Sequence, residues 1–337
     1  MKKILGLVLV AILVASMVVF AATAEEGSGF KVGFSLPTMQ EERWSKTENF
    51  MNKVFEEKFP NSELIVQMAN GSSDTQYSQI ENLITQGIDA LIVAPVDVSS
   101  LGPVCDRCHE EGILVIAYTR CPESCWVDAY FDYDLYSCGV AQASSALEAA
   151  PEGNYVLLGG DSNHNGVPVI RQGWTDVLQE SIDSGAINVI LDQNCAGWDP
   201  SVAMANMENA LAMSGNDIAA VVVMNDTMAG GVVEALDTQG LAGKVYVTGQ
   251  DGDKAAIKRI IEGTQMMTNL QNIITETEVV AEMCFDLLEG REFEFSGVYN
   301  NGLMDINTIY VPTTKIVKDN IQSVLIDTGY YTMDDLT

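Results

Sequence analysis

The sequence predicts an α/β protein with two doubly wound lobes, each built on a parallel sheet. Short apolar, β-branched runs alternate with segments whose apolar residues recur at i, i+3 and i+4, a pattern typical of βαβ units. The 337 residues are too many for one typical core. A repeated motif also favours two similar lobes, because IENLITQGIDALIVAPV over 80–96 is echoed by MENALAMSGNDIAAVVVMN over 207–225.

Continuous apolar runs mark the strands. Ala90–Ala94 is apolar at every position, as expected of a strand that helices cover on both faces. Between the runs, the faces formed by Ile80, Leu83 and Ile84 and by residues 257, 260 and 261 indicate amphipathic helices. In chain order the predicted strands are Lys31–Leu36, Glu63–Met68, Ala90–Ala94, Leu114–Tyr118, Asn154–Gly159, Asn188–Gln193, Ala219–Val223, Val245–Gly249 and Gln265–Leu270.

Residues 1–24 are predicted to be a signal peptide. Lys2 and Lys3 precede an apolar run from Ile4 to Phe20, and a small-residue cleavage site ends at Ala24. We expect cleavage there and a freely soluble protein in the periplasm, although a run of about 17 residues is also near the minimum for a retained membrane anchor. No cysteine precedes Cys105, which excludes a lipid-anchored cysteine at the cleavage point.

The chain is strongly acidic. Its 17 Lys and Arg residues against 47 Asp and Glu residues give a net charge of −30, and removal of the signal, with its two lysines, makes the charge more negative. Such a surface repels phosphate backbones and anionic lipid headgroups. We therefore expect no nucleic-acid partner and no membrane partner, and the simplest meaning of the acidity is solubility.

Seven cysteines in an exported chain point to disulfides, with at least one thiol left over. Cys105 and Cys108 lie in a predicted helix, whereas Cys121 and Cys125 lie in the loop after the next strand. A four-cysteine zinc site is an alternative that topology disfavours, because the helix runs back down the sheet and should keep its cysteines about 10 Å from that loop. A Cys121–Cys125 disulfide is favoured instead, and Cys284 is expected to be a buried free thiol.

Signals for catalysis are few. The chain has only two histidines, His109 in a predicted helix and His164 in a glycine-rich loop, and no nucleophile elbow, phosphate loop or zinc-protease motif. Asp132 and Asp134 are the one candidate pair of glycosidase carboxylates. Two residues apart near an expected lobe crossing, they fit better as caps of the helix that follows. We expect no enzymatic activity, no cofactor and no metal.

Signals for binding are stronger. A monosaccharide presents hydroxyl groups around an apolar ring face, so its site needs Arg, Asp and Asn side chains together with an aromatic plate. The carboxyl ends of parallel strands meet at one edge of a sheet, where such ligands bind. Side chains of the required kinds follow successive predicted strands at Arg43, Trp44, Arg120, Asn165, Trp198, Asn225, Asp226 and Asp251.

Beyond these positions, the chain resembles the periplasmic sugar-binding proteins of ABC importers, of the ribose-binding type and closest to its xylose-binding members. The resemblance covers essentially the whole chain after the signal. It rests on Glu42-Arg43-Trp44, Ala69-Asn70-Gly71, Gln79-Ile80-Glu81-Asn82, Ala117-Tyr118-Thr119-Arg120, Gly153-Asn154-Tyr155, Leu158-Gly159-Gly160, Gly197-Trp198-Asp199-Pro200, Met207-Glu208-Asn209-Ala210-Leu211, Asn225-Asp226-Thr227, Ala229-Gly230-Gly231, Gly249-Gln250-Asp251, Gly263-Thr264-Gln265 and Asn301-Gly302-Leu303.

The resemblance implies a type I periplasmic binding protein, whose two Rossmann-like lobes are joined by a three-segment hinge and close over the ligand. The N-terminal lobe would hold residues 30–129 and 271–303, and the C-terminal lobe 130–270 and 304–337. Arg43, Arg120, Asn225, Asp251 and Asn165 would hydrogen-bond the sugar, and Trp44 and Trp198 would sandwich its ring. Asp226 would cap the helix that starts at Thr227.

Departures from the xylose-binding pattern bear on which sugar is bound. Thr119 stands where those proteins carry Asp, His164 and Gly166 replace an expected Asp and Asn, and Pro37 and Thr38 replace two Asp residues. Gln271 replaces a Lys that reaches the sugar. Each buried hydroxyl left without a partner costs about 1–3 kcal/mol, so two such losses lower affinity more than tenfold. Xylose leads, and another pentose, a hexose or a larger glycoside stays open.

The function implied is that of a monomeric solute-binding protein that captures a monosaccharide and delivers it to the membrane permease of an ABC transporter. A sensor subunit that presents its ligand to a chemoreceptor or a sensor kinase is the alternative. A sugar-responsive repressor of the same fold is disfavoured, because it would need an N-terminal DNA-binding domain and a basic face, whereas this chain starts with an export signal and is strongly acidic.

Overall fold

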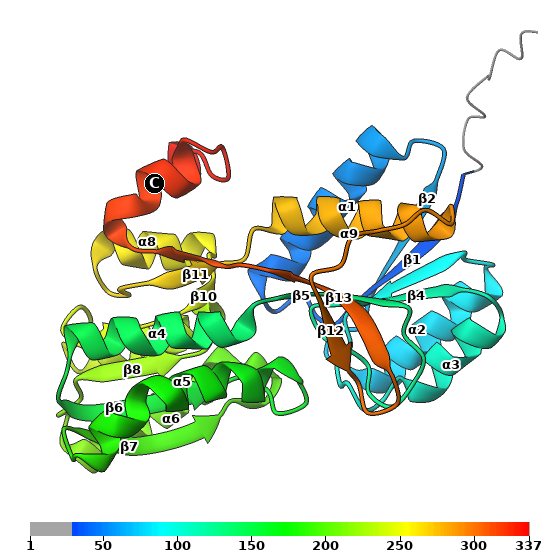
Figure 1. Ribbon diagram of the computed structural model, residues 1–337. Coiled ribbons are helices and arrows are strands. Elements are labelled where there is room, and N and C mark those ends of the chain that lie inside the picture. Colours follow the sequence, from blue (N-terminus) through cyan, green and yellow to red (C-terminus); the bar gives the residue numbers. More distant parts are fainter. Residues whose placement is uncertain (1–28, 337) are drawn as a thin grey trace, which may run out of the picture.

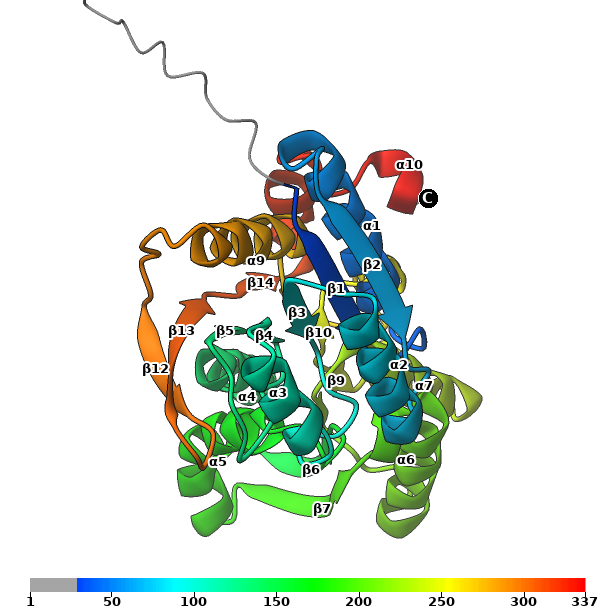
Figure 2. The ribbon, with the colours of Figure 1, turned by 90° about the vertical axis from the view of Figure 1, so that its right-hand side faces the viewer.

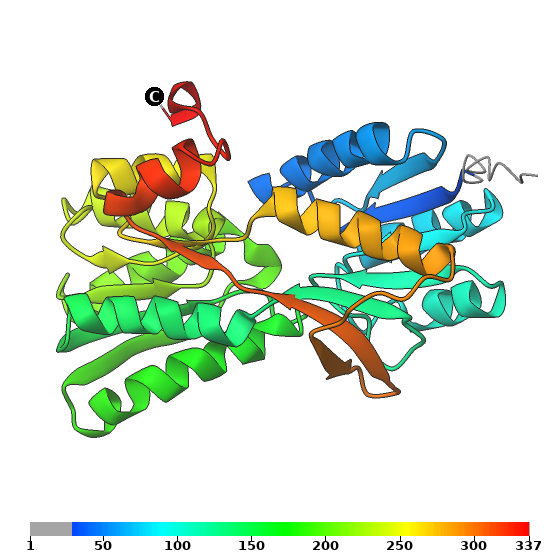
Figure 3. The same cartoon turned by 45° about the horizontal axis from the view of Figure 1, so that its top comes forward.

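The computed structural model describes residues 29–336, and the predicted signal peptide lies outside them. Two α/β lobes lie side by side and are joined by segments of chain that run between them (Figures 1 and 3). No helix within the described residues is long and apolar enough to cross a membrane.

The first lobe is built on a seven-stranded sheet with the strand order β12-β13-β5-β4-β3-β1-β2. All neighbours in it are parallel except β12 and β13, which form an antiparallel hairpin at the end opposite β2 (Figure 2). The strands are β1 Lys31–Leu36, β2 Glu63–Met68, β3 Ala90–Val93, β4 Leu114–Tyr118, β5 Ala129–Tyr133, β12 Gly297–Asn300 and β13 Asp305–Val311.

Helices cover both faces of this sheet, as the continuous apolar runs predict. Phe34 and Ile92 pack with α1 and α9 on one face, while Leu91 and Val93 pack with α2 and α3 on the other. This division follows from the two-residue period of a strand, which turns alternate side chains to opposite faces. The helices are α1 Glu42–Lys58, α2 Ser73–Thr85, α3 Gly102–Glu110 and α9 Ile273–Leu288.

The second lobe holds a four-stranded parallel sheet in the order β7-β6-β8-β9 and a three-stranded sheet in the order β10-β11-β14. The strands are β6 Gly153–Gly159, β7 Ile187–Asn194, β8 Ala220–Val223, β9 Tyr246–Val247, β10 Gln250–Asp251, β11 Thr268–Leu270 and β14 Thr314–Ile316. The helices are α4 Leu135–Ala149, α5 Gly166–Asp183, α6 Pro200–Ser214, α7 Asp226–Thr238, α8 Lys254–Glu262 and α10 Met333–Leu336, with shorter turns η1 Ala196–Trp198, η2 Lys318–Asn320 and η3 Gln322–Ile326.

The chain passes between the lobes after β5, between β11 and α9, and between β13 and β14 (Figure 3). Two of these crossings lie later in the chain than the sequence predicts, because the expected lobe boundaries are at 129/130 and 303/304. Residues 130–133 pair with β4, and residues 308–311 pair with β5, inside the first sheet. The difference arises because β5 contains the buried acid Asp132 and β13 alternates buried and exposed residues, so neither segment is a continuous apolar run.

Helix caps also differ from expectation in detail. Asp134 caps α4 by accepting the Ser137 N–H at 3.0 Å. Asp132 does not cap a helix, because β5 continues through Tyr133. The cap of α7 is Asn225, which accepts the Met228 N–H at 3.0 Å. The carboxylate of Asp226 instead accepts N–H groups of residues 252 and 253 at 2.9 and 3.0 Å, so it braces the loop after β10.

Candidate functional site

Nine of the ten predicted site residues line one small cavity between the lobes, which we call the central cavity. They come from the carboxyl ends of strands or the segments that follow: Arg43 and Trp44 after β1, Thr119 and Arg120 after β4, His164 after β6, Trp198 after β7, Asn225 after β8, Asp251 in β10 and Gln271 after β11. Glu41, Asp132, Leu135, Ile170 and Gln250 complete the lining. The cavity measures about 20 Å³, room for about one water molecule, so the lobes lie closed on each other and a sugar requires them to part.

Arg43 connects both lobes within this cavity. Its guanidinium donates to Glu276 Oε1 at 3.1 Å and to Gln271, and lies 3.7 Å from Asp251 of the second lobe. Burial alone lowers the pKa of Arg43, but Glu276 and Asp251 raise it above its usual value. Burial raises the pKa of Glu276 to about 7 in spite of Arg43. The arginine is therefore a permanent cation whose partners lie on both sides of the cleft.

Arg120 is the second buried cation. It donates to the Pro95 carbonyl at 3.1 Å and lies 3.8 Å from Glu41. Burial lowers the pKa of Arg120, Glu41 opposes this shift, and Arg43 adds to it. Glu41, which the sequence analysis did not single out, thus offsets part of the repulsion between two neighbouring arginines.

Trp44 lies against both arginines. The guanidinium carbons of Arg43 and Arg120 lie 4.6 and 5.2 Å from its ring centre, a cation–π arrangement. Its indole N–H donates to Glu41 at 2.9 Å, and its ring packs edge-on against Tyr118. In this closed arrangement Trp44 supports the arginines, and the expected sandwich of a sugar between Trp44 and Trp198 would need the guanidinium groups to move.

Three cavity residues have backbone conformations that side-chain-bearing residues rarely adopt. The φ angles of Thr119, Trp198 and Asp251 are 55°, 56° and 102°. Such strained residues cluster at functional sites, where the surrounding structure holds them in place. Here the three strained residues are predicted ligand contacts, and they lie at or after the ends of three different strands.

His164 is neutral. Its Nδ1 accepts the Gly166 N–H at 2.9 Å, so the proton is assigned to Nε2, where it can be donated. Burial, followed by Arg120 and Arg43, lowers the pKa of His164 well below its usual value. The ring lies edge-on to Trp198 at 5.6 Å. His164 thus supplies an uncharged donor where an acid was expected.

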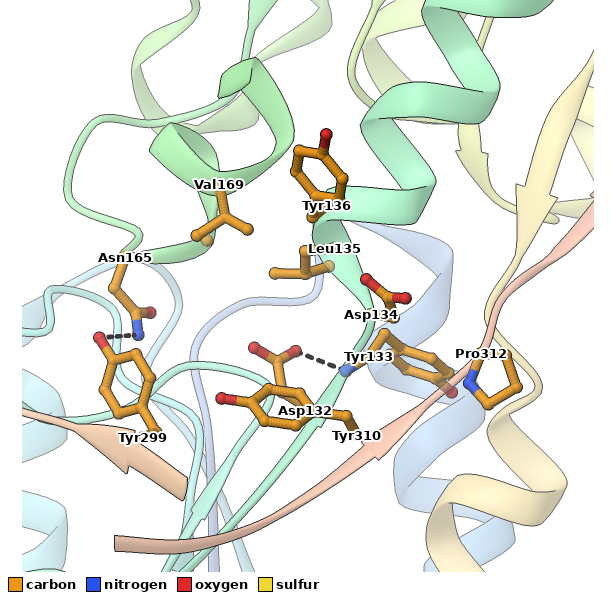
Figure 4. A pocket seen from close by; sticks show the side chains of 11 residues that line it. Asp132, Tyr133, Asp134, Leu135, Tyr136, Asn165, Val169, Tyr299, Tyr310 and Pro312 are labelled. Carbon is orange, nitrogen blue, oxygen red and sulfur yellow. Dashed lines mark hydrogen bonds between the residues drawn. The ribbon is translucent and has the colours of Figure 1, made fainter. Parts of the chain in front are cut away.

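Asn165 is the one predicted residue that the structure places outside the central cavity. Its Nδ2 donates to the Tyr299 hydroxyl of the first lobe at 2.9 Å (Figure 4). It lines a second cavity of about 430 Å³ with Asp132–Tyr136, Gly166, Val169, Tyr299, Tyr310 and Pro312. This hinge-side cavity shares Asp132 and Leu135 with the central cavity. Asn165 therefore acts here as a contact between the lobes.

A third cavity, of about 350 Å³, adjoins the central cavity at Glu41, Arg120 and Trp198. It includes Pro37 and Thr38, the positions that depart from the xylose-binding pattern. The space next to the central cavity is thus large enough for a small-molecule group on this side as well.

Asp132 lies in β5 and is not the helix cap that the sequence predicts. It accepts hydrogen bonds from the Tyr133 N–H at 2.8 Å and from the Tyr130 hydroxyl, two residues back on the same strand face. Burial raises the pKa of Asp132 to about 7. Asp132 lines both the central cavity and the hinge-side cavity, which makes it a candidate contact for a ligand in either.

Unpartnered polar atoms concentrate in the central cavity. Between residues 29 and 336, six buried side-chain nitrogen or oxygen atoms have no hydrogen-bond partner. Four belong to this cavity: Arg43 Nε, Thr119 Oγ1, Arg120 Nε and Trp198 Nε1. Buried polar groups are nearly always paired, and an unpaired one costs about 1–3 kcal/mol. The arrangement therefore suits a ligand rich in hydrogen-bonding oxygens.

The described part of the chain contains no group of three or more His, Cys, Asp or Glu side chains suited to hold a metal ion. All seven cysteines are buried and unbonded to one another. The Cys121–Cys125 disulfide favoured by the sequence is not formed in this structure.

Residues 32–292 match the family model described as "Periplasmic binding protein domain". The chain is 38% identical to the D-xylose-binding periplasmic protein of Escherichia coli, with 94% of each chain covered. It is 31% identical to the multiple sugar-binding periplasmic receptor ChvE of Rhizobium radiobacter over all of both chains. An ABC transporter solute-binding protein of Clostridium phytofermentans, solved with bound β-D-glucose, superposes with a TM-score of 0.84 at 29% identity, covering 91% of this chain and 100% of the other.

Proposed function

The chain belongs to the periplasmic binding protein family, and from this premise we propose that it captures a monosaccharide between its lobes and delivers it to the permease of an ABC importer. Its fold is the type I fold of that family, and it is a binding protein rather than an enzyme. We propose that it works as a monomer in the periplasm, after removal of residues 1–24.

The observation that carries the proposal is the set of four unpartnered polar atoms in the central cavity. Three of them are N–H donors on Arg43, Arg120 and Trp198, and the hydroxyl of Thr119 can donate or accept. A sugar hydroxyl accepts from two donors while it donates to a carboxylate such as Asp251. Neutral polyols fit this mixture better than anions do, because buried acids are interspersed with the arginines.

We assign the sugar contacts to both lobes. Arg43 and Arg120 would hold hydroxyls from the first lobe, Asn225 and Asp251 from the second, and Trp198 would cover the apolar ring face. Contacts to both lobes exist together only when the cleft is shut, so ligand binding favours closure. Arg43, which already spans the cleft to Asp251, couples the two halves of the site.

D-Xylose is the leading ligand, because a D-xylose-binding periplasmic protein shares 38% of its residues with this chain. Thr119 and Gln271 stand in the cavity where the resemblance expects an acid and a lysine, which removes two charged hydroxyl partners. The third cavity beside Arg120 and Trp198 gives space for a further substituent. A pentose, a hexose or a short glycoside is therefore within the proposed class.

Calorimetric titration of the mature protein tests the proposal. The panel is D-xylose, D-ribose, D-glucose, D-galactose, D-allose, methyl β-D-xyloside and xylobiose, with an amino acid and a nucleoside as other classes. We expect micromolar or tighter binding of at least one neutral sugar. Asp251→Ala should weaken it by about 2–5 kcal/mol, as for loss of a buried charged partner, whereas Asp237→Ala, an exposed position of the same lobe, should not. Binding of only a non-sugar, or full affinity in Asp251→Ala, would refute the assignment.

A sensory role is the second candidate, because the relative ChvE, matched over its whole length, is named a receptor. Both roles use the same closed, sugar-bound form, so they are separated in cells. Deletion of the gene should abolish uptake of the bound sugar if the chain serves an importer. Normal uptake with a lost chemotactic or transcriptional response to that sugar would favour the sensor.

A further inference from the structure

Four of the seven cysteines gather in one place. Cys105 and Cys108 on α3, and Cys121 and Cys125 in the loop between β4 and β5, are fully buried in the same apolar cluster. The separation of about 10 Å expected between helix and loop is too large for one pair, because Cys125 lies against α3 one helical turn from Cys105. The loop does not stay at the end of β4 but folds back along α3.

Contacts of the neighbouring residues fix the positions of Cys105 and Cys125 relative to each other. The N–H of Trp126, next to Cys125, donates to Asp106 Oδ1, next to Cys105, at 2.8 Å. A Cβ placed on Gly102, one turn before Cys105 on the same helix face, would lie 3.9 Å from the Cβ of Cys125. Cys125 therefore lies over the face of α3 that carries Cys105.

The outer side of the loop is fixed as well. The Ser124 N–H donates to the Asn301 carbonyl at 2.8 Å, and Asn301 Nδ2 donates to the carbonyls of Cys125 and Pro122 at 2.8 and 3.1 Å. The backbone at Cys125 is thus tied to α3 on one side and to the turn between β12 and β13 on the other.

We propose that Cys105 and Cys125 form a disulfide in the exported protein. Each thiol gives up one proton and one electron, the S–S bond forms, and a disulfide-bearing oxidant of the extracytoplasmic space is reduced to two thiols. The other cysteines stay reduced. Cys121 donates its S–H to the Pro122 carbonyl at 3.5 Å, and Cys284 lies apart on α9.

Oxidation is placed during folding, before the loop covers α3. In the folded protein the neighbouring Cys125 thiol, followed by burial, raises the pKa of the Cys105 thiol well above its usual value. A thiol that keeps its proton reacts poorly with a disulfide, because the thiolate is the nucleophile. The link closes a segment that contains β4 and the cavity residues Thr119 and Arg120. It therefore fastens the first lobe's share of the site without depending on which ligand binds there.

Peptide mapping of the protein exported to an oxidising periplasm tests the link directly. Free thiols are alkylated in denaturant without reductant, and trypsin is followed by a protease that cuts after Glu. The lysine, arginine and glutamate positions then separate Cys105 (82–107), Cys108 (108–110) and Cys121 (121–123) from the fragment 124–148. We expect 82–107 joined to 124–148, with fragmentation placing the link at Cys125. Linkage of 121–123 to 124–148, or alkylation of all seven cysteines, would overturn the proposal.

Thermal unfolding supplies a second readout. A reductant should lower the Tm of the exported protein by several degrees, because it releases the constraint on the unfolded chain. The same reductant should not change the Tm of the double variant Cys105→Ser/Cys125→Ser, and the control Cys284→Ser should keep the full response. An equal response in the double variant would contradict the pairing, and failure of that variant to fold leaves the peptide map decisive.

Discussion

Replacement of Gly160 by Ala tests whether Trp198 is the aromatic plate of the site. A Cβ at residue 160 would lie 2.1, 2.2 and 2.4 Å from three atoms of the Trp198 ring. Ordinary contacts of a Cβ are no closer than about 3.4 Å, so the ring must move by about 1 Å. A gap of that size forfeits up to about half of each dispersion contact. Loss of much of the stacking on a sugar face should then weaken binding about tenfold, or ~1.4 kcal/mol.

The assay is calorimetric titration with the best sugar of the panel, together with the quenching of tryptophan fluorescence by that sugar. Gly230→Ala in α7 is the matched control, because its Cβ would meet only the end of the Arg259 side chain at 3.4 Å and Ala is favoured in a helix interior. An unchanged dissociation constant in Gly160→Ala, with the fold intact by circular dichroism, would refute the role of Trp198 as the plate.

Three further predictions concern the same region. Burial raises the pKa of Asp132 and of Glu276 to about 7, so the folded protein holds these protons more tightly than the unfolded chain does. The free energy of unfolding should therefore fall as pH rises from about 4 to 7. Urea titrations at several pH values should show a smaller fall in Asp132→Asn, and an identical pH dependence in both proteins would contradict the buried acid. Tyr299→Phe removes the hydrogen bond to Asn165 between the lobes, and the loss of about 0.5–1.5 kcal/mol from the shut form should weaken sugar affinity roughly twofold to tenfold in calorimetry, whereas an unchanged affinity would show that this contact does not bias closure. Thr119→Asp restores a missing acid, so it should tighten xylose binding in calorimetry if xylose is the ligand, and weaker binding would favour another sugar.

The limits of β1, β2 and β4 agree with the predicted ranges, although Ser35 and Gln67 interrupt the apolar runs of β1 and β2. The fully apolar run Ala90–Ala94 also forms a strand, which ends one residue earlier, at Val93. The hairpin β12–β13 was not predicted, since strands with one exposed face alternate and β12 lies at the sheet edge. β5 was missed because a buried Asp132 interrupts it, and its partner, the Tyr130 hydroxyl, is apparent only in three dimensions.

The central cavity was predictable in outline because parallel strands deliver their C-terminal loops to one edge. Glu276 was not predictable in this way, since it lies in the first turn of α9 and reaches Arg43 only through the packing of α9 on α1. Asn165 follows a strand like the others, yet it lies one residue past His164 and turns to Tyr299. Strand order brings a loop to the site, but the conformation of the loop decides which of its side chains enters.

If the chain serves an importer, the four unpartnered atoms of the central cavity would also affect how often the importer engages a carrier without sugar. If no hydroxyls meet them, each raises the free energy of the shut form by about 1–3 kcal/mol, and even a combined bias of about 3 kcal/mol keeps that form below about one per cent of molecules. An importer that recognises only shut carriers would then seldom engage one that has nothing to deliver. If these atoms hold the sugar as proposed, they would thereby also limit ATP hydrolysis that moves no sugar.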